Sequence, residues 1–479
     1  MYERYDGLMC MPEHARGIGM EEVIVENYEE AERFLAEIPK FTKKNLFEET
    51  KAFYAYIQSC DKGQYSETNL GSIIHVAGTN GKGSVCAFMQ QICLESGYKT
   101  GMFTSPHLVT TRERFCIDGK IISEEAFVEA FNWLTQMLCG YHNKKYCPTY
   151  FERLFFMAVY LFTKEKVDVT VLETGLGGRL DTTNIIASPT LTIITQIGLD
   201  HMEYLGDTIE KIASEKAGII KCGVPVVFSD RKIQSSAVIR KKATEYGCKC
   251  YAVSKNDYKI NEIQKKYIDF SVVSRYYDYC GFTAYTTAVY QVENAAIAIR
   301  ACEILQRDSN LKKITIDSIH KGIKKMRWAG RMEEIEQRIY IDGAHNEDGI
   351  EAFVQSVKEM TKVMDGKNIK YILIFSVMKD KQYDRMIEML CNLCMITEFV
   401  VTHIPGERGA KLTELKEKFS EYTNKNIHIY EKIEDAIEYS ILSRKDQGVV
   451  YIVGSLYLAG FVEKFFVDKR AGRCLEERS

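Results

Sequence analysis

The sequence predicts an α/β fold divided into two domains, each built on a mainly parallel sheet covered by helices. The chain has 479 residues, which exceeds the size at which one hydrophobic core usually stops growing. Short apolar runs typical of buried strands alternate with segments of helical period, and this alternation is typical of doubly wound sheets. Ligands of such folds bind at the carboxyl ends of the strands.

The first domain is expected to span residues 1–327. Its strand-like runs are 73–77, 100–104, 167–173, 191–197 and 224–228, and its helix-like segments are 85–96, 124–138, 150–163, 208–217 and 291–305. Residues 259–288 form short alternating segments rich in Tyr and Phe. This alternation predicts an antiparallel appendage.

The strand and helix pattern then starts again in a smaller second domain. Residues 328–338 are expected to be a linker and residues 339–479 the second domain. Five strand-like runs separated by helix-like segments, at 339–341, 369–375, 399–402, 427–430 and 449–453, predict a Rossmann-like α/β unit.

Composition excludes several classes of protein. The net charge of −3 comes from 63 basic and 66 acidic residues, which argues against nucleic acid or an anionic membrane as a partner. The longest apolar run, 154–162, is shorter than the roughly 20 residues that a membrane helix needs, and the opening residues lack the apolar core of a signal peptide. The 15 cysteines have no framework spacing. We therefore expect a cytoplasmic protein with free thiols, in which Cys391 and Cys394 pack rather than bind metal.

A glycine-rich turn is the most informative motif. It follows the apolar run 73–77, precedes the helix-like segment 85–96 and consists of Gly78, Thr79, Asn80, Gly81, Lys82, Gly83 and Ser84. In a P-loop, such a turn brings backbone N–H groups to a polyphosphate, the lysine lies along the β- and γ-phosphates, and the hydroxyl ligates magnesium. Gly83 departs from the usual pattern, and the alternative is a plain strand-to-helix turn. The motif predicts a P-loop, doubly wound mononucleotide-binding domain.

Two further strand ends carry metal-binding side chains. Glu173 ends the strand-like run 167–173 and precedes a glycine-rich loop, and His201 follows the run 191–197 together with Asp200. An acid in this position is typical of a magnesium ligand in a nucleotide enzyme. The alternative role of Glu173 is to cap a loop, and the alternative role of His201 is structural. Because the carboxyl ends of parallel strands meet, we expect these residues in one cleft with the P-loop.

Other candidates depend on how the chain folds. Lys216 lies near the end of a helix-like segment, where spacing alone predicts a solvent-facing cation. Asp342 and His345 follow the first strand of the second domain, and Arg331 lies in the linker. These three residues reach a nucleotide only if the two domains face each other across a cleft.

Six ordered motifs together resemble one known family. They are the P-loop 78–84, then 104–108 (Thr-Ser-Pro-His-Leu), 173–181 (Glu-Thr-Gly-Leu-Gly-Gly-Arg-Leu-Asp), 198–201 (Gly-Leu-Asp-His), 215–220 (Glu-Lys-Ala-Gly-Ile-Ile) and 342–346 (Asp-Gly-Ala-His-Asn). The combination closely resembles folylpolyglutamate synthase and its bifunctional form with dihydrofolate synthase, in the superfamily of muramyl peptide ligases. The likeness extends from about residue 38 to about residue 465.

The resemblance implies an ATP-dependent ligase with ATP and Mg²⁺ as cofactors. Such an enzyme phosphorylates the carboxylate of a folate, and the amine of L-glutamate then attacks the acyl phosphate. Dihydropteroate is the second acceptor that the bifunctional form implies. Transfer of the γ-phosphoryl group turns a carboxylate oxygen into a leaving group, and nearby cations offset the charge of the phosphate.

The resemblance also assigns roles to single residues. It implies Ser84, Glu173 and His201 as magnesium ligands, and Lys82 as the phosphate clamp. Lys216 falls where the family carries a carbamylated lysine, an anion that binds or positions a metal. Lys82, Lys216, His201 and His345 are the implied catalytic residues. Nucleotide contacts are implied for Asn294, Arg331 and Asp342, the glutamate or phosphate region for His345 and Ser455, and the folate pocket for Ser105, Pro106, His107, Phe151 and Glu152.

Two alternatives remain at this point. A muramyl peptide ligase usually has a separate N-terminal domain, whereas fewer than eighty residues precede this P-loop. The second alternative is a nucleotide-binding protein without synthetic activity. The Asn-Lys-x-Asp motif of a GTP switch is, however, absent from the sequence. We expect a monomer whose partners are small molecules.

Overall fold

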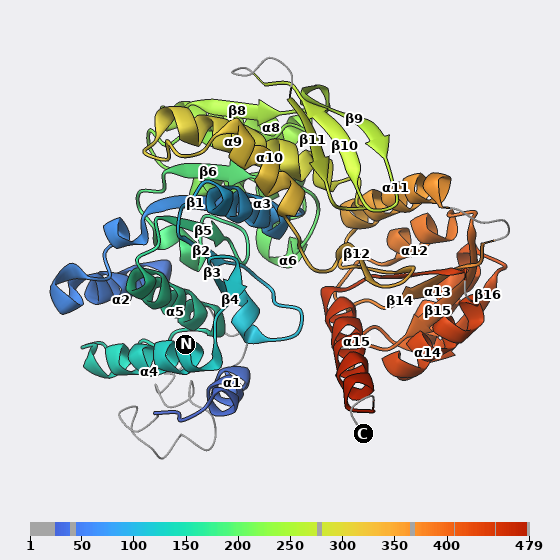
Figure 1. Ribbon diagram of the computed structural model, residues 1–479. Helices are drawn as coiled ribbons and strands as arrows, with labels where there is room; N and C mark the ends of the chain where they lie inside the picture. The colour runs from blue at the N-terminus through green and yellow to red at the C-terminus, as the bar shows by residue number, and fades with distance from the viewer. Residues whose placement is uncertain are drawn as a thin grey trace.

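The computed structural model describes residues 24–38, 45–274, 280–364, 369–406, 408–445 and 447–476. It shows two sheet-containing domains side by side (Figure 1). The predicted two-domain α/β fold is confirmed. No helix in these ranges combines the length and the apolar character that crossing a membrane requires.

An eight-stranded sheet forms the centre of the first domain, in the order β4-β3-β2-β5-β1-β6-β7-β8. The six strands from β2 to β8 pair in parallel, whereas β3 and β4 are antiparallel additions at one edge. The bounds are β1 Ser72–Ala77, β2 Thr100–Phe103, β3 Phe115–Ile117, β4 Lys120–Ile121, β5 Val169–Glu173, β6 Leu191–Ile194, β7 Val226–Ser229 and β8 Cys250–Val253. The sequence pattern missed β3, β4 and β8, which are short strands at or next to an edge of the sheet.

Helices cover both faces of this sheet. They are α1 Tyr28–Glu37, α2 Phe47–Ser59, α3 Lys82–Glu95, α4 Glu124–Gly140, α5 Tyr150–Glu165, α6 Met202–Leu205, α7 Ile209–Lys216, α8 Ile233–Glu245, α9 Gln291–Asp308 and α10 Ile316–Lys325. Helices α3, α9 and α10 share one apolar core, and α1, α2, α4 and α5 share another on the opposite face (Figure 1). The site at the strand ends therefore has a rigid support on both sides.

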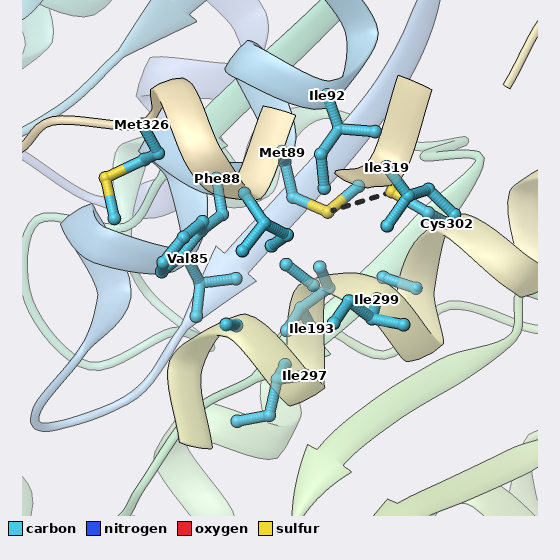
Figure 2. Close-up of a cluster of buried hydrophobic side chains, with 14 of the residues drawn as sticks. Val85, Phe88, Met89, Ile92, Ile193, Ile297, Ile299, Cys302, Ile319 and Met326 are labelled. Carbon is cyan, nitrogen blue, oxygen red and sulfur yellow. Dashed lines mark hydrogen bonds between the residues drawn. The ribbon is translucent and has the colours of Figure 1, made fainter. Parts of the chain in front are cut away.

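Helix α3, which begins inside the P-loop, is buried nearly all round. Val85, Phe88, Met89 and Ile92 of α3 pack against a cluster of buried side chains from β6, α9 and α10 (Figure 2). Gly322 of α10 lets the two helices approach closely, because a Cβ there would lie 2.5 Å from Ile92. Burying each such side chain stabilises the fold by about 1.5–3 kcal/mol. This packing fixes the N-terminus of α3, and with it the P-loop.

The predicted antiparallel appendage is a three-stranded sheet in the order β11-β10-β9. Its strands are β9 Tyr258–Ile263, β10 Ile268–Val272 and β11 Cys280–Ala284. Phe270 and Phe282 of this sheet belong to the core that contains α3, α9 and α10.

The second domain has a six-stranded sheet in the order β12-β13-β17-β14-β15-β16. All neighbours pair in parallel except β12. The strands are β12 Arg331–Glu336, β13 Ile339–Asp342, β14 Tyr371–Phe375, β15 Ile396–Thr402, β16 Asn426–Tyr430 and β17 Val449–Val453. Helices α11 Glu347–Val363, α12 Asp384–Cys391 and α13 Leu412–Tyr422 cover one face, and α14 Ile433–Arg444 and α15 Leu456–Glu476 cover the other.

Strand β12 lies within residues 328–338, the segment predicted to be a linker. Its sequence, Arg-Met-Glu-Glu-Ile-Glu, is mostly charged, and its pairing with β13 shifts register twice. Bulged, charged strands are typical of sheet edges, which makes them difficult to recognise from apolar periodicity. Residues 326–330 therefore connect the end of α10 to the second sheet.

Candidate active site

A cavity lies where the carboxyl ends of β1, β5 and β6 face the second domain. Its lining includes the whole P-loop 78–84, together with Ser105, Pro106, Glu173, Asp200, His201, Lys216 and Asn294 from the first domain and Arg331, Asp342 and His345 from the second. The structure thus brings the predicted phosphate, metal and nucleotide residues to one place. The condition that the two domains face each other is met.

Close packing determines the conformation of the P-loop. Gly78 and Gly81 have φ of 155° and 87°, and a Cβ at these positions would lie 1.8 Å from the Thr195 hydroxyl and 2.3 Å from Asn294 Oδ1. The backbone N–H groups of Thr79 and Asn80 donate to the carbonyl oxygen of Gln196. Gly81 is the N-cap of α3 and supplies no side chain to the first turn. The N–H groups at the start of α3 are therefore open to an anionic ligand.

Lys82 and Ser84 lie in the first turn of α3, and Glu173 faces Lys82. Lys82 Nζ donates to Thr79 O at 3.4 Å and lies 3.9 Å from Glu173 Oε1. Glu173 is buried, and its Oε2 accepts a 3.0 Å hydrogen bond from the backbone of Ser105. Burial raises the pKa of Glu173, against the influence of Lys82. The buried Ser84 hydroxyl accepts from Gln291 Nε2 at 3.1 Å.

Asp200 connects the two domains beside the cavity. Its carboxylate accepts hydrogen bonds from Lys381 Nζ at 2.6 Å and Asn346 Nδ2 at 3.1 Å, and lies 3.4 Å from His345 Nε2. Burial alone would raise the pKa of Asp200, but the hydrogen bond from His345 and the surrounding positive charges hold it well below its usual range. Asp200 is therefore an anion that holds three side chains of the second domain.

His201 follows Asp200 with a left-handed backbone, at φ 50°. Burial lowers the pKa of His201 to about 4, and Lys381, His345 and Lys82 act in the same direction against the raising influence of Asp200. The imidazole is therefore neutral at physiological pH, which is the form that ligates a metal.

Lys216 is not the solvent-facing cation that its spacing predicts. It is 4% exposed, and its Nζ donates a 2.7 Å hydrogen bond to Gly78 O. Burial first, and then the charge of Lys82, lower the pKa of Lys216 to about 7. The expectation failed because helical period cannot show that the P-loop covers this end of α7.

The second domain contributes a buried acid next to a cation. Asp342 accepts hydrogen bonds from Tyr290 Oη at 2.6 Å, from the Met332 N–H at 3.0 Å and from the Ala344 N–H at 2.8 Å. Burial raises the pKa of Asp342, and the charge of Arg331 lowers it. Arg331 and Asp342 are paired across β12 and β13.

The residues predicted for the folate pocket, together with Ser455 of the predicted glutamate or phosphate region, divide into two groups. Ser105 and Pro106 line the cavity, whereas four others do not appear in its lining: His107, Phe151, Glu152 and Ser455. Glu152 is buried and accepts hydrogen bonds from Thr50 and Asn45, so that it anchors α2 to α5. Ser455 caps α15 by accepting from the Tyr457 N–H at 3.1 Å.

His107 and Phe151 lie near the cavity without lining it. His107 Nδ1 accepts a 2.9 Å hydrogen bond from Arg114 Nε. The ring of Phe151 packs over Gly175, a residue that does line the cavity, with a hypothetical Cβ only 2.7 Å from the ring. His107 is therefore tied to the segment that precedes β3, and Phe151 packs against the glycine-rich loop that follows β5.

Sequence reasoning missed several residues of the site. The sequence shows Asp200 next to His201, but it does not show that Asp200 accepts hydrogen bonds from side chains of the second domain. Lys381 and Gln291 carried no motif, and their neighbours are 181 and 207 positions away in the chain. Only the fold brings them together.

A P-loop domain and a smaller α/β domain that face each other across a cavity are the two domains of a Mur-type ligase. Residues 76–302 match the family described as the Mur ligase middle domain, and residues 330–456 match the one described as the Mur ligase, glutamate ligase domain. Within that class, the chain belongs to the folylpolyglutamate synthase and dihydrofolate synthase family of ATP-dependent ligases.

Individual relatives agree with this assignment. The chain is 35% identical over 397 residues to the dihydrofolate synthase/folylpolyglutamate synthase of Bacillus subtilis, covering 81% of this chain and 89% of that protein. It is 36% identical over 294 residues to a folylpolyglutamate synthase of Arabidopsis thaliana, covering 59% of this chain and 50% of that protein. E. coli FolC, solved with DHPP and ADP, has the same fold, with a TM-score of 0.78, 24% identity and coverage of 93% and 99%.

Proposed function

We propose that the protein adds L-glutamate to a folate in an ATP-dependent reaction, and that dihydropteroate is a second acceptor. The observation that carries this proposal is the convergence of the P-loop, Glu173 and Lys216 with Arg331 and Asp342 around one interdomain cavity. This arrangement supports the activity named for the Bacillus subtilis relative.

The P-loop would hold the phosphates of ATP. The backbone of Gly78, Thr79, Asn80, Gly81 and Gly83 would approach the ligand closely. The N–H groups at the start of α3, which no side chain caps, favour an anion there. Lys82 adds a positive charge to the same turn. Asn294, Arg331 and Asp342 would hold the nucleoside part from the two sides of the cavity.

The residues around Glu173 fit a magnesium ion. Glu173 is a buried carboxylate whose nearest cation is 3.9 Å away, and a buried carboxylate is stabilised by a close cation. Ser84, Glu173, His201 and carbamylated Lys216 would hold Mg²⁺ through mostly oxygen ligands, as this ion prefers. When bound, the ion neutralises charge that builds up on the transferred phosphoryl group.

Carbamylation of Lys216 has a physical basis in its surroundings. A pKa of about 7 leaves a large share of the amine neutral at physiological pH. A neutral amine attacks the carbon of CO₂, an N–C bond forms, and one proton leaves to solvent. The product carries a negative charge in place of a positive one, which removes the repulsion between Lys216 and Lys82.

The ligase reaction then follows in two steps. A carboxylate oxygen of the acceptor attacks the γ-phosphorus of ATP, the bond to ADP breaks, and an acyl phosphate forms. The glutamate amine attacks the acyl carbon, phosphate leaves, and the amine gives up a proton. Lys82 stabilises the phosphoryl group in the first step, and His345 and Ser455 lie in the second domain on the side proposed for glutamate. Contacts between Asp200 and the second domain join the two walls of the cavity, and closure of these walls would limit access of water to an acyl phosphate.

We further propose that the enzyme acts as a cytoplasmic monomer. The described cysteines are free thiols, as a reducing compartment would keep them. Light scattering after gel filtration tests the monomer.

A phosphate-release assay tests the function. The protein is incubated with ATP, Mg²⁺ and L-glutamate, and with tetrahydrofolate, dihydropteroate or a muramyl peptide precursor as acceptor. We expect release with the first two acceptors that depends on glutamate. Release only with the muramyl peptide would assign the protein to the other branch of the superfamily, and release that needs neither acceptor nor glutamate would indicate a nucleotide hydrolase.

A further inference from the structure

Arg114 is a buried cation near the cavity that the reaction described above does not use. It ends a short 3₁₀ turn, Thr111–Arg114, and precedes β3. Its carbonyl oxygen accepts a 3.1 Å hydrogen bond from the Thr104 N–H, which places it opposite the carboxyl end of β2. The residue is 8% exposed.

The order of strands places Arg114 on one side of the phosphate site. The strands β1, β5, β2 and β3 are neighbours in this order (Figure 1). Along the carboxyl edge of the sheet, the P-loop follows β1, Glu173 ends β5, Ser105 follows β2, and Arg114 precedes β3. Neighbouring strands lie about 4.8 Å apart, so β3 is about 10 Å from β5 and about 14 Å from β1. Arg114 is therefore close to the carboxylate and metal region but distant from the P-loop.

The guanidinium of Arg114 lacks a compensating anion. Its Nε donates to His107 Nδ1 at 2.9 Å, and its Cζ lies 5.4 Å from the centre of the Tyr150 ring. Within the described ranges, neither Nη group makes a hydrogen bond to the protein, and no carboxylate forms an ion pair with Arg114. Arg114 thus retains four N–H donors in a nearly buried position.

The acidic groups around Arg114 already have other partners. Those that act on its charge are Tyr150, Tyr457, Glu173 and Glu113. The Glu113 carboxylate accepts hydrogen bonds from the backbone of Leu108, Val109 and Thr110. Glu173 accepts from Ser105 and faces Lys82. A buried charge without a partner is costly, and a planar fork of free N–H groups matches the shape of a carboxylate.

We propose that Arg114 binds the α-carboxylate of the glutamate residue at the end of a folate substrate. The inference rests on the proposed function. In such a substrate the γ-carboxylate reacts and the α-carboxylate lies on the same residue, so an anion is expected about one strand spacing beyond the reacting group. Dihydropteroate has only the carboxylate that reacts. Arg114 therefore distinguishes acceptors that end in glutamate from dihydropteroate.

The test compares acceptors as well as enzymes. The acceptors are tetrahydrofolate, its analogue with the α-carboxylate converted to a carboxamide, and dihydropteroate. The enzymes are the wild type, Arg114→Gln, Arg114→Lys and the control Arg112→Gln. Arg112 lies on the same turn but pairs with Glu124 and with the carbonyl oxygen of Ile122. Each kcat/KM is measured with saturating ATP, Mg²⁺ and glutamate.

We expect Arg114→Gln to lower kcat/KM for tetrahydrofolate by about 10- to 100-fold, as loss of a charge-assisted hydrogen bond does. The values for the carboxamide analogue and dihydropteroate should change less than about threefold, because neither offers the α-carboxylate that Arg114 binds. Arg114→Lys should keep part of the preference, because it retains the charge and loses the fork. Arg112→Gln should match the wild type for all three acceptors.

Several results would overturn the proposal. Equal losses for the three acceptors would show that Arg114 only positions the loop through His107, and a rise in KM for ATP or glutamate would assign it to another anion. If Arg114→Gln does not fold, the wild type decides, since it must prefer tetrahydrofolate to the carboxamide analogue by about 10-fold or more. A wild type that turns over neither folate nor dihydropteroate would instead contradict the proposed function.

Discussion

The ammonium of Lys216 donates a hydrogen bond of 2.7 Å to the carbonyl oxygen of Gly78, the first glycine of the P-loop. This contact joins the end of α7 to the phosphate site across 138 positions of the chain. It places a lysine of lowered pKa beside Lys82, two cations that share one cavity. Conversion of Lys216 to a carbamate would relieve this repulsion.

We expect Lys216 to incorporate CO₂. With ¹³C-labelled bicarbonate, the wild type should show a carbamate carbon signal that is absent from Lys216→Met. Activity of the variant should fall by about 100-fold or more, since the anion that positions the metal is lost. A wild-type spectrum without the signal would contradict carbamylation, while the activities would still measure the importance of the side chain.

Lys82→Ala is expected to lower turnover by about 100-fold or more and to leave the fold intact. The side chain supplies positive charge to a cavity and fills no core volume. Steady-state phosphate release and thermal unfolding measure the two effects. Lys99→Ala, which removes a surface lysine paired with Glu165, is the control. Near-normal activity of folded Lys82→Ala would contradict the phosphate role.

For Glu173→Gln we expect the magnesium concentration at half-maximal activity to rise by about tenfold or more. Glutamine keeps the size of the side chain and removes the charge that a cation needs. Glu95→Gln, at the other end of α3, removes a carboxylate that pairs with Lys325 and should leave the magnesium response unchanged. An unaltered titration of Glu173→Gln would indicate that Glu173 serves only to accept from Ser105.

His75 should make the protein sensitive to acid. It is fully buried, and its Nε2–H donates to Thr183 Oγ1 because that hydroxyl already donates to Asp181. Burial lowers the pKa of His75 to about 3. Between pH 6.5 and 3 the unfolded chain therefore binds a proton that the native protein does not, and stability falls as pH falls. By pH 5 the loss is about 2 kcal/mol.

Denaturant unfolding of the wild type and His75→Gln between pH 7.5 and 5 measures this effect. The variant lacks the titrating ring, so its stability should decline less over this range. Parallel stability curves would show that His75 is not the group that titrates.

Glu463 of α15 should have the opposite dependence on pH. Burial, and then the charges of Glu333 and Glu113, raise its pKa to about 7, although Arg470 acts against them. Between pH 4.5 and 7 the native protein holds a proton that the unfolded chain releases, so stability falls as pH rises. The side chain is partly exposed, which reduces the expected gain of Glu463→Gln to about 1 kcal/mol at pH 8.

Thermal unfolding at pH 8 and pH 4.5 tests this prediction. Glu463→Gln should unfold at a higher temperature than the wild type at pH 8, and the difference should diminish at pH 4.5. A difference that is the same at both values would point to packing instead of charge.

Apolar periodicity predicted the parts of the fold that are buried on both sides. The runs that became β1, β5, β14 and β17 are continuous and apolar, as interior parallel strands are. Strands β3, β4, β8 and β12 lie at or near sheet edges, where short or charged sequences suffice. Periodicity has little to detect in such segments.

The same limit applies to the site. The P-loop, Glu173 and His201 were predicted because they follow recognisable strands, and the structure brings them together. The orientation of Lys216 and the burial of the Arg114 guanidinium depend on contacts between distant segments. Such contacts leave no local pattern, and the placement of Glu152 away from the cavity has the same cause.

The short connection at residues 326–330 has a mechanical consequence. Trp328 packs its indole over Gly83 of the P-loop, where a Cβ would lie 2.9 Å from the ring. Gly330 has φ of 67°, and Arg331 already belongs to the second sheet. Along this connection, an interdomain rotation would have to bend the backbone between Trp328 and Arg331, and Arg331 would move with the second domain. Through the nucleotide contact proposed for Arg331, occupancy of the nucleotide and the angle between the domains would be thermodynamically linked, and each would bias the other by the same free energy.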